Sequence, residues 1–193
     1  ESDGQTLFIE GRRREVPTLV KDARRDMISG SDKRNQIEVF EFDPNAPSFG
    51  AGGAKIIDVR ILDRNGSILP LIEGGEELTV EVTCKAHNEL YSPIVGFLLR
   101  DRLGQNIFGD NTYLSHSATP IAIPAGDTFR AQFTFQMPYM PSGDYSIAAA
   151  LAEGTQNEHR QHHWVDDALI FHCRSSHVTH GIIGLPMADI QLI

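Results

Sequence analysis

Side chains able to hold a hydroxyl-rich ligand gather in the stretch 96–112, which reads GFLLRDRLGQNIFGDNT. An apolar run ends in Arg100 and Asp101, a turn follows at Gly104, and a second apolar pair leads to Asn111. The pattern predicts two strands joined by a turn, with guanidinium, carboxylate and amide groups at their ends. Such groups exchange hydrogen bonds with hydroxyls but form no recognisable reaction centre, so the stretch favours binding of a sugar over catalysis.

The only tryptophan, Trp164, is a second candidate, because two carboxylates follow it closely at Asp166 and Asp167. Its ring is either a core aromatic or a flat platform for the apolar face of a sugar, and the sequence leaves both interpretations open. In the binding interpretation, the two aspartates and His162 bind the sugar hydroxyls. Strand alternation places His162 on the same face as Trp164.

Histidines are frequent around the tryptophan, but their spacing does not indicate a metal site. In HRQHHW, His159 and His163 share one face of a strand and lie too far apart to hold one metal ion without a bend. No recognisable ligand spacing comes from the remaining candidates His172, His177 and His180. We therefore predict no metal and no cofactor.

Catalytic motifs are missing from the sequence as well. It has no GxSxG, HExxH, GxxxxGK or GxGxxG motif, and its glycine-rich FGAGGA run precedes a strand pattern instead of a phosphate-binding helix. Neighbouring carboxylates such as Asp166 and Asp167 point to opposite faces of a strand, so they do not form an acid–base pair. The sequence predicts a protein that is not an enzyme.

The acidic composition excludes further classes of partner. The 193 residues carry a net charge of -9 and a pI near 5.3, which disfavours nucleic acid and an anionic membrane surface. No apolar run approaches the roughly 20 residues that cross a bilayer, so we expect no membrane insertion. The two cysteines, Cys84 and Cys173, are interpreted as buried thiols of a reducing compartment, with a disulfide between two sheets as the alternative.

Residues 1–31 differ from the rest of the chain and are predicted to be a linker or a short amphipathic helix. Apolar residues recur there at helical spacing, at Leu19, Val20, Ala23, Met27 and Ile28. We expect the helix to begin after Pro17, with Thr18 as its N-cap. Its arginines are expected on a solvated face, where they are balanced by Glu15, Asp22 and Asp26.

Residues 32–193 show the two-residue period of β-strands. In LTVEVTCKA, apolar and polar residues alternate, which predicts a buried face made of Leu78, Val80, Val82 and Cys84. The KIIDVRILD run places on one face Ile57, Val59 and Ile61. Strands that recur between turn clusters predict an all-β fold, an antiparallel two-sheet β-sandwich of immunoglobulin-like or jelly-roll-like type. The final GIIGLPMADIQLI ends in a short apolar strand candidate, an edge suited to pairing with a second copy.

Three blocks of sequence resemble one family, in the order in which they occur there: FGAGGAKIIDVRILDRNG, VGFLLRDRLGQNIFGDNT and HHWVDDALIFHC. From about Phe49 onward, the chain resembles the C-terminal carbohydrate-binding domain of the ATP-binding subunit in bacterial O-antigen polysaccharide ABC transporters (Wzt type). The resemblance implies a β-sandwich that binds the non-reducing, often capped, end of an undecaprenyl-linked glycan before export. Such binding gives the exporter its substrate specificity.

The resemblance also implies partners and a location. The domain is expected to form a homodimer, since the transporter is two-fold, and the GLPMADIQLI strand is a candidate for swapping between the two copies. The transporter supplies a membrane permease and an ATPase domain. The Walker motifs of that ATPase are absent from this sequence, so the chain is expected to be the isolated binding domain, with residues 1–31 remaining from the link. The expected location is cytoplasmic, peripheral to the inner membrane through the transporter.

The family supplies no single sugar-binding residue that can be transferred, so the candidate site rests on side-chain chemistry. Planar polar groups beside an aromatic face suit a shallow, wet glycan site, which selects Arg100, Asp101, Asn111, Trp164 and Asp166. A structural role competes at the GDNT turn, because Asp and Asn also bond their own backbone. The alternative function is a dimerising β-sandwich that positions a partner protein without binding glycan. A metal-dependent sugar enzyme, a third possibility, would require bound metal.

Overall fold

Strand β12 (His159–Arg174) is the longest element and organises the larger of two sheets. The computed structural model describes residues 17–31, 34–175 and 181–193. The larger sheet runs in the order β4 (Leu71–Ile72), β1 (Gln36–Val39), β12, β11 (Gly143–Gly154), β7 (Pro93–Asp101) and β8 (Asn106–Asn111). A short strand, β2 (Ser48–Phe49), pairs with the same edge of β12 as β1, farther along it. Every pair in this sheet is antiparallel.

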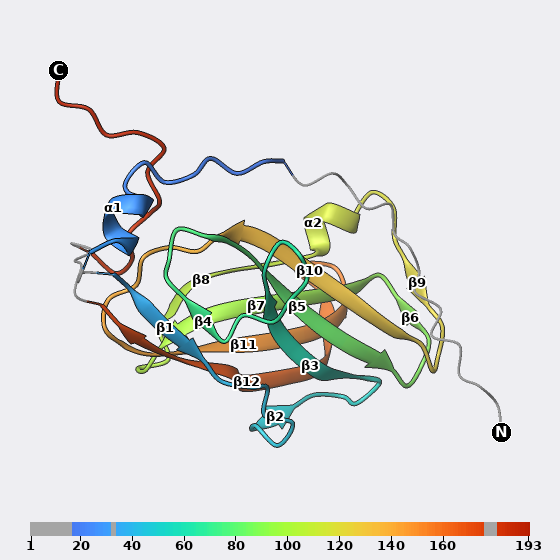
Figure 1. Ribbon diagram of the computed structural model, residues 1–193. Coiled ribbons are helices and arrows are strands. Elements are labelled where there is room, and N and C mark those ends of the chain that lie inside the picture. The colour runs from blue at the N-terminus through green and yellow to red at the C-terminus, as the bar shows by residue number, and fades with distance from the viewer. Residues whose placement is uncertain (1–16, 32–33, 176–180) are drawn as a thin grey trace.

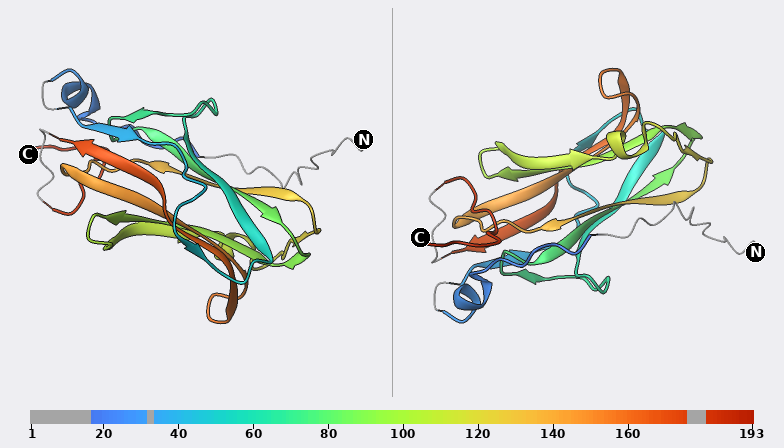
Figure 2. Two further views of the ribbon diagram at one scale, coloured as in Figure 1. Left: turned by 90° about the horizontal axis from the view of Figure 1, so that it is seen from below. Right: turned by 90° about the horizontal axis from the view of Figure 1, so that it is seen from above.

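The smaller sheet forms a second layer against the larger one (Figures 1 and 2). It contains three antiparallel strands, β10 (Thr128–Gln136), β5 (Glu77–Ala86) and β3 (Ala54–Leu62). A separate two-stranded ribbon consists of β6 (Leu90–Tyr91) and β9 (Ala122–Ile123). In the described residues the helices are α1 (Arg25–Ser29) and α2 (Tyr113–His116). This arrangement confirms the predicted all-β, antiparallel two-sheet sandwich.

The core lies between the two sheets and follows the alternation of their strands. On β5 the residues predicted to point inward are all buried, namely Leu78, Val80, Val82 and Cys84. The larger sheet contributes buried side chains that include Phe171, Ile147 and Leu151. Phe97 of β7 stacks on Phe135 of β10 with ring centroids 5.8 Å apart, which joins the two layers directly.

Strand β3 departs from strict alternation at a β-bulge. Its register with β5 shifts between Ile56 and Asp58, so Ile56 is buried and Ile57 is 44% exposed. The prediction that Ile57 shares a face with the core residues is therefore wrong. Val59 and Ile61, beyond the bulge, are buried together as predicted.

The two cysteines are free and buried, one in each sheet. Cys84 lies on β5 and Cys173 on β12. Burial raises the pKa of the Cys173 thiol to about 11, and it also raises the pKa of Cys84. The structure thus confirms that the two cysteines are buried thiols and do not form a disulfide.

The amino-terminal segment is less helical than predicted. Helix α1 begins at Arg25, with Arg24 as a cap residue that makes no side-chain capping bond, so the predicted N-cap at Thr18 is wrong. Asp26, expected to balance an arginine, instead pairs with Lys21 at 2.9 Å on an exposed surface. Residues 1–16, which include Glu15, lie outside the described residues.

Asp22, expected on a solvated face, is instead 3% exposed and joins this segment to the C-terminal one. Its carboxylate accepts from the backbone N of Arg24 at 2.6 Å, from that of Met187 at 2.7 Å, and from the Arg24 guanidinium at 2.9 Å. The backbone N of Ala23 donates to the carbonyl of Met187 at 2.9 Å. We call this junction the Asp22 clasp: Asp22, Ala23, Arg24 and Met187. It holds the two segments side by side at one end of the sandwich (Figure 2).

The C-terminal apolar stretch does not form a strand of either sheet. Within the described residues, its β-type pairing is the single bridge between Gly184 and Tyr139. Beyond that bridge the apolar side chains are exposed, including Ile190, Leu192 and Ile193. The predicted terminal strand is thus not formed within one chain.

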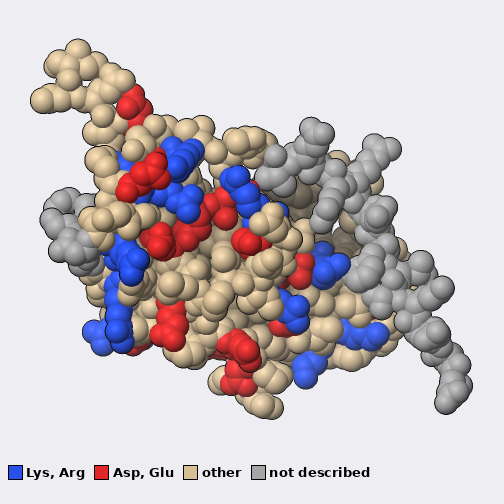
Figure 3. Space-filling view, in the orientation of Figure 1, with Lys and Arg blue, Asp and Glu red and all other residues tan. Residues whose placement is uncertain are grey.

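The surface of the smaller sheet is electrostatically mixed. Figure 3 shows acidic and basic side chains intermingled over this sheet and α1, without a large area of one sign. That face therefore offers no basic surface for a polyanion. In the part of the chain that the structure describes, no helix is long and apolar enough to cross a membrane.

Candidate functional site

The candidate residues lie mainly on the outer face of the larger sheet, which points away from the smaller sheet. In β7, Phe97 and Leu99 are buried in the core between the sheets. Because successive side chains of a strand point to opposite faces, the alternate residues face outward: Gly96, Leu98 and Arg100.

One row of paired residues crosses this outer face. Trp164 of β12 pairs with Ala150 of β11, which also pairs with Gly96 of β7. Gly96 in turn pairs with Asn111 of β8. Adjacent strands lie about 4.8 Å apart, so the backbones of Trp164 and Asn111 stand about 14 Å apart on the same face. Two residues predicted from separate parts of the sequence therefore share one surface.

At one end of this surface, Arg100, Trp164 and Asp166 are joined by hydrogen bonds. Asp166 Oδ1 accepts from Arg100 Nη1 and from Trp164 Nε1, both at 2.8 Å. The guanidinium carbon of Arg100 lies 5.2 Å from the centre of the Trp164 ring, in cation–π contact. Arg100 Nε also donates to Asn106 Oδ1 at 3.0 Å. Together with Phe49, these residues are called the Arg100 cluster: Phe49, Arg100, Asn106, Trp164 and Asp166.

A β-bulge in β12 positions Asp166. Val165 pairs with Ala149 and Leu169 pairs with Ile147, so β12 advances by four residues where β11 advances by two. The extra length is absorbed at Asp167, whose φ of 52° lies in the left-handed region that aspartate tolerates better than most residues. The backbone N of Asp166 consequently donates to the carbonyl of Pro47, at 2.9 Å, on the β2 side of the strand.

Phe49 completes the cluster, and the sequence analysis missed it as a site residue. Its ring stacks on Trp164 with centroids 6.0 Å apart and planes inclined by 19°, while 59% of the residue remains exposed. At the next residue, Gly50, a Cβ would come within 2.2 Å of the carbonyl oxygen of His162, so only glycine lets the chain lie this close to β12. A lone phenylalanine beside a glycine-rich run was the signal available in the sequence.

Small residues form the floor between the cluster and Asn111. They come from three neighbouring strands and are Gly96, Gly109, Ala148 and Ala150, with the larger side chain of Leu98 between Ala148 and Gly109. At Gly109, a Cβ would lie 2.2 Å from the carbonyl oxygen of Phe97, so a larger residue requires the backbone to move. The floor is therefore apolar, and the polar and aromatic groups stand at its sides.

Asn111 stands opposite the cluster and is partly engaged by its own turn. Its Oδ1 accepts from the backbone N of Tyr113 at 2.9 Å, and its Nδ2 lies 3.4 Å from Gln156 Oε1. The turn role that the sequence analysis weighed is thus present. One amide hydrogen and one oxygen lone pair stay available for a ligand.

Asp101 is not brought together with the other four predicted residues. It pairs in register with Tyr145, whose side chain is buried in the core, so it does not share the outer face with Arg100. Its Oδ1 accepts from the backbone N of Leu103 and of Gln105, both at 2.9 Å. These bonds stabilise the turn between β7 and β8.

His162 does not share a face with Trp164, contrary to the prediction. It is buried, with Nε2 3.1 Å from Glu153 Oε2. The register between β11 and β12 shifts at this residue, which breaks the alternation on which the prediction rested.

The other histidines also have structural surroundings. His163 Nδ1 accepts from the backbone N of Ile56 at 3.1 Å, and burial, helped by nearby Lys55, lowers the pKa of His163. His172 pairs with an exposed aspartate, Asp144, at 2.6 Å. His177 and His180 lie outside the described residues. Across the described ranges, no three metal-ligating side chains come together.

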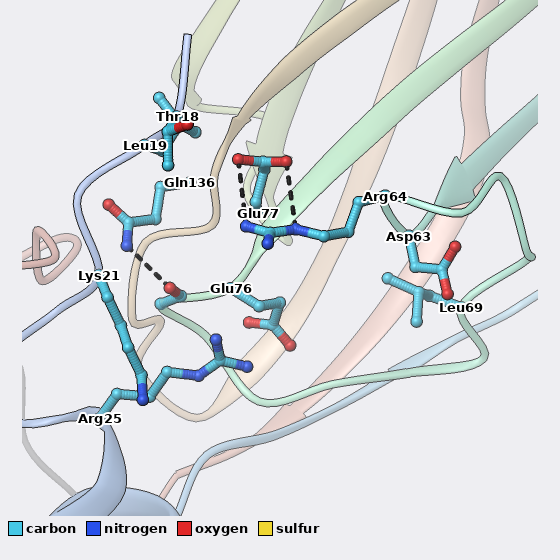
Figure 4. Close-up of a pocket in the computed structure, with 11 residues that line it drawn as sticks. Thr18, Leu19, Lys21, Arg25, Asp63, Arg64, Leu69, Glu76, Glu77 and Gln136 are labelled. Atoms are coloured by element: carbon cyan, nitrogen blue, oxygen red, sulfur yellow. Dashed lines mark hydrogen bonds and ion pairs between the residues drawn. The ribbon is translucent and has the colours of Figure 1, made fainter. Parts of the chain in front are cut away.

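Two cavities lie away from the Arg100 cluster. One, of about 620 Å³, opens between the segment before α1 and the start of β5. Figure 4 shows that Arg25 points into it, that Arg64 reaches Glu77, and that Gln136 donates to the Gly75 carbonyl. Its lining mixes both signs of charge. The other, of about 740 Å³, lies at the far end of the outer face, where its lining includes Arg34, Gln36, His172 and Arg174.

The described residues define a β-sandwich module whose polar and aromatic side chains meet on an open sheet face and not in a deep catalytic pocket. The model of the family described as the Wzt C-terminal domain matches residues 45–185, and the chain belongs to that family.

Comparison with solved structures agrees with the family. The crystal structure of the C-terminal domain of Wzt superposes with a TM-score of 0.67 at 23% sequence identity, covering 79% of this chain and 92% of that one. This likeness shows a shared fold. A β-glucuronidase of glycoside hydrolase family 2 aligns with a TM-score of only 0.31 at 14% identity, over 60% of this chain and 11% of that one, which carries no argument. No curated protein sequence matches the chain.

Proposed function

We propose that this chain is a non-catalytic module that binds the non-reducing end, capped or not, of a lipid-linked O-antigen polysaccharide. Through this binding it gives substrate specificity to the ABC exporter that transports the glycan. The observation that carries the proposal is the Arg100 cluster, where Trp164 and Phe49 stack beside the Arg100–Asp166 pair on an exposed sheet face. Membership of the Wzt C-terminal domain family supports it.

The cluster has the chemistry that sugar recognition requires. Aromatic rings bury the apolar C–H face of a pyranose, while planar polar groups exchange directional hydrogen bonds with its hydroxyls. Phe49 offers an exposed ring, and Asn111 stands across the floor from it with unused hydrogen-bonding capacity. A shallow surface of this kind admits ordered water and suits one end of a long chain.

The same proposal includes the partners. We expect a homodimer in which the C-terminal segment exchanges between copies, because its apolar side chains, Ile190, Leu192 and Ile193, are exposed within one chain. We expect the module to work at the cytoplasmic side of the inner membrane, beside the ATPase domain and the membrane permease of the transporter. Light scattering on the whole chain and on a chain ending after 184 tests the dimer; a monomer in both cases contradicts it.

Retention of polysaccharide on immobilised protein tests the binding. The purified chain should retain the O-polysaccharide of its own source strain and let pass a polysaccharide with a different terminal sugar. Phe49→Ala and Phe49→Leu should both weaken retention, because leucine keeps the bulk and loses the flat ring. The matched control is Arg60→Ala, which removes the arginine of the Arg60–Asp58 pair on the smaller sheet, 2.5 Å in length, and should change nothing.

The outcome also separates glycan binding from the alternative of a pure interaction module. A folded wild-type chain, verified by circular dichroism, that retains none of its matched polysaccharide contradicts the proposal. In that case, dimer formation alone would remain to explain the exposed C-terminal segment.

A further inference from the structure

Within the Arg100–Asp166 pair, one acceptor atom and one donor atom are not used by the protein. Both strong bonds to the carboxylate end on Asp166 Oδ1, from Arg100 Nη1 and Trp164 Nε1. Among the described residues, Asp166 Oδ2 and Arg100 Nη2 have no hydrogen-bond partner, and the two side chains are 37% and 21% exposed. Oδ2 shares a carbon with Oδ1, and Nη2 shares a carbon with Nη1. The unused acceptor and the unused donor therefore belong to one ion pair.

Two hydroxyls on neighbouring carbons of a sugar ring match this arrangement. One hydroxyl donates to Oδ2, and its neighbour accepts from Nη2, so both contacts form without displacing the existing bonds. Phe49, stacked on Trp164, offers an aromatic face to the same ring. The Asn106 side chain, held by Arg100 Nε at 3.0 Å, fixes the guanidinium plane and thereby the direction of Nη2.

The charge of the surface is balanced within the pair. The positive charge of Arg100 is matched by Asp166, and the other polar groups nearby, Asn106 and Asn111, are neutral. The exposed acid Asp167 stands next to the pair in the bulge. A carboxylate on a bound sugar would meet Asp166 at short range with no unmatched cation in the cluster to receive it.

Resting on the proposed function, we propose that the site selects an uncharged sugar residue with two adjacent hydroxyls, and that Asp166 is the residue that excludes acidic sugars. Trp164 anchors this carboxylate through its indole N–H. The specificity thus depends on one carboxylate oxygen that the protein itself leaves unused.

The single tryptophan supplies a direct reporter, because its indole N–H gives one resonance and bonds to Asp166 Oδ1. The probes are methyl glycosides of neutral hexoses, each paired with the uronic acid that differs only in a carboxylate. In titrations of the ¹⁵N-labelled chain, at least one neutral glycoside should shift the indole resonance. The corresponding uronic acid glycoside should bind about tenfold more weakly.

Two variants should move this preference in opposite directions. Asp166→Asn keeps the acceptor for the indole and leaves the charge of Arg100 unmatched. The affinity for the uronic acid should therefore rise, and the ratio of the neutral to the acidic affinity should shrink or invert. Arg100→Gln leaves the carboxylate unmatched, so the ratio should widen. A merely structural role would move both ratios alike. Asp58→Asn, in the matched pair on the smaller sheet, should leave the ratio unchanged.

The outcomes distinguish this inference from the proposed function. It is overturned if wild-type protein binds the uronic acid glycoside as tightly as the neutral one, or if Asp166→Asn and Arg100→Gln change the ratio in the same direction or not at all. It is also overturned if the polysaccharide is retained while no neutral glycoside shifts the indole resonance; the proposed function then stands alone. If neither glycosides nor the polysaccharide bind, the proposed function itself fails.

Discussion

Two arginine–aspartate pairs lie against aromatic rings at opposite places in this molecule, and their surroundings give them different roles. Arg24 stands 5.6 Å from the centre of the Tyr139 ring and bonds to Asp22, while Arg100 stands 5.2 Å from that of Trp164 and bonds to Asp166. Both ion pairs measure close to 2.9 Å, at 2.9 and 2.8 Å. The residue types and the contacts of the cations are therefore nearly the same.

The carboxylates differ in how many of their oxygens the chain itself satisfies. Asp22 is buried, with Oδ1 bonded by Arg24 and Oδ2 bonded by both Arg24 and Met187. Asp166 is partly exposed and uses only Oδ1. A saturated carboxylate holds segments of the fold together, whereas a half-used one keeps capacity for a ligand.

The largest difference between the pairs should appear in stability. Asp22→Ala leaves the partly buried Arg24 guanidinium without its carboxylate and the N–H of Met187 without an acceptor, so we expect a loss of about 2–3 kcal/mol in the free energy of unfolding. Asp166→Ala should cost less than about 1 kcal/mol, because its pair is partly exposed. Urea denaturation measures both, with the highly exposed Asp26 as control in Asp26→Ala. Equal losses of unfolding free energy in Asp22→Ala and Asp166→Ala would contradict the different roles assigned to the two pairs.

Glycan retention should respond in the opposite way. Arg100→Ala removes the donor that faces the ligand and leaves Trp164 without its cation, so retention should fall by about tenfold, equivalent to about 1.4 kcal/mol. Arg24→Ala should lower stability and leave retention unchanged at a temperature where the variant is folded. Retention on a column, with circular dichroism for folding, compares the two; a loss of retention in Arg24→Ala would show that the clasp supports the site.

Strong acid should weaken the Asp22 clasp. Burial alone would raise the pKa of Asp22, but the bonds from Arg24 and Met187 outweigh it, and the pKa is lowered from 3.8. The unfolded chain therefore binds this proton more readily, so stability rises with pH in this window and is lost as the pH falls below about 3.8 through the lowered value. The effect should be smaller than that of Asp22→Ala, because protonation preserves some hydrogen bonds. Unfolding curves on wild type and Asp22→Asn, whose pH dependence should be weaker, provide the measurement.

The smallest effect should come from Asp101, the predicted site residue that belongs to a turn. Asp101→Asn keeps an oxygen acceptor for Leu103 and Gln105, so neither stability nor retention should change. Asp101→Ala should cost about 1 kcal/mol in stability, through the turn, and still leave retention unchanged. Reduced retention in Asp101→Asn with normal stability would return this residue to the binding surface.

Local alternation predicts much of this fold from the sequence. The buried face of β5 follows directly from LTVEVTCKA, since every second residue is apolar and no bulge interrupts the strand. Ile57 and His162 were misplaced for a shared reason: each lies where a bulge adds a residue to the strand. A bulge depends on the partner strand, so a period read along one strand does not reveal it.

The sequence predicts which residue types form the candidate site, but it does not predict how the fold brings them together. Arg100, Trp164 and Asp166 were chosen for their chemistry, and the hydrogen bonds among them depend on the pairing of β7, β11 and β12. Phe49 escaped notice because its strand, β2, is only two residues long and lies within a loop rich in proline and glycine. Asp22 escaped because its burial depends on Met187, far along the chain.

The Asp22 clasp gives the molecule a short mechanical load path. Residues 22–24 and 185–187 are bound to each other through Asp22, the backbone of Ala23 and the Arg24 contact with the Leu185 carbonyl. Tension applied to the chain ahead of α1 therefore reaches the C-terminal segment without crossing the packed core. The joined segments contact the rest of the protein at Tyr139, through the bridge to Gly184 and the Arg24 guanidinium, and at Glu73, which accepts from Ser29 Oγ at 3.0 Å. We therefore expect a displacement of either segment to move the other.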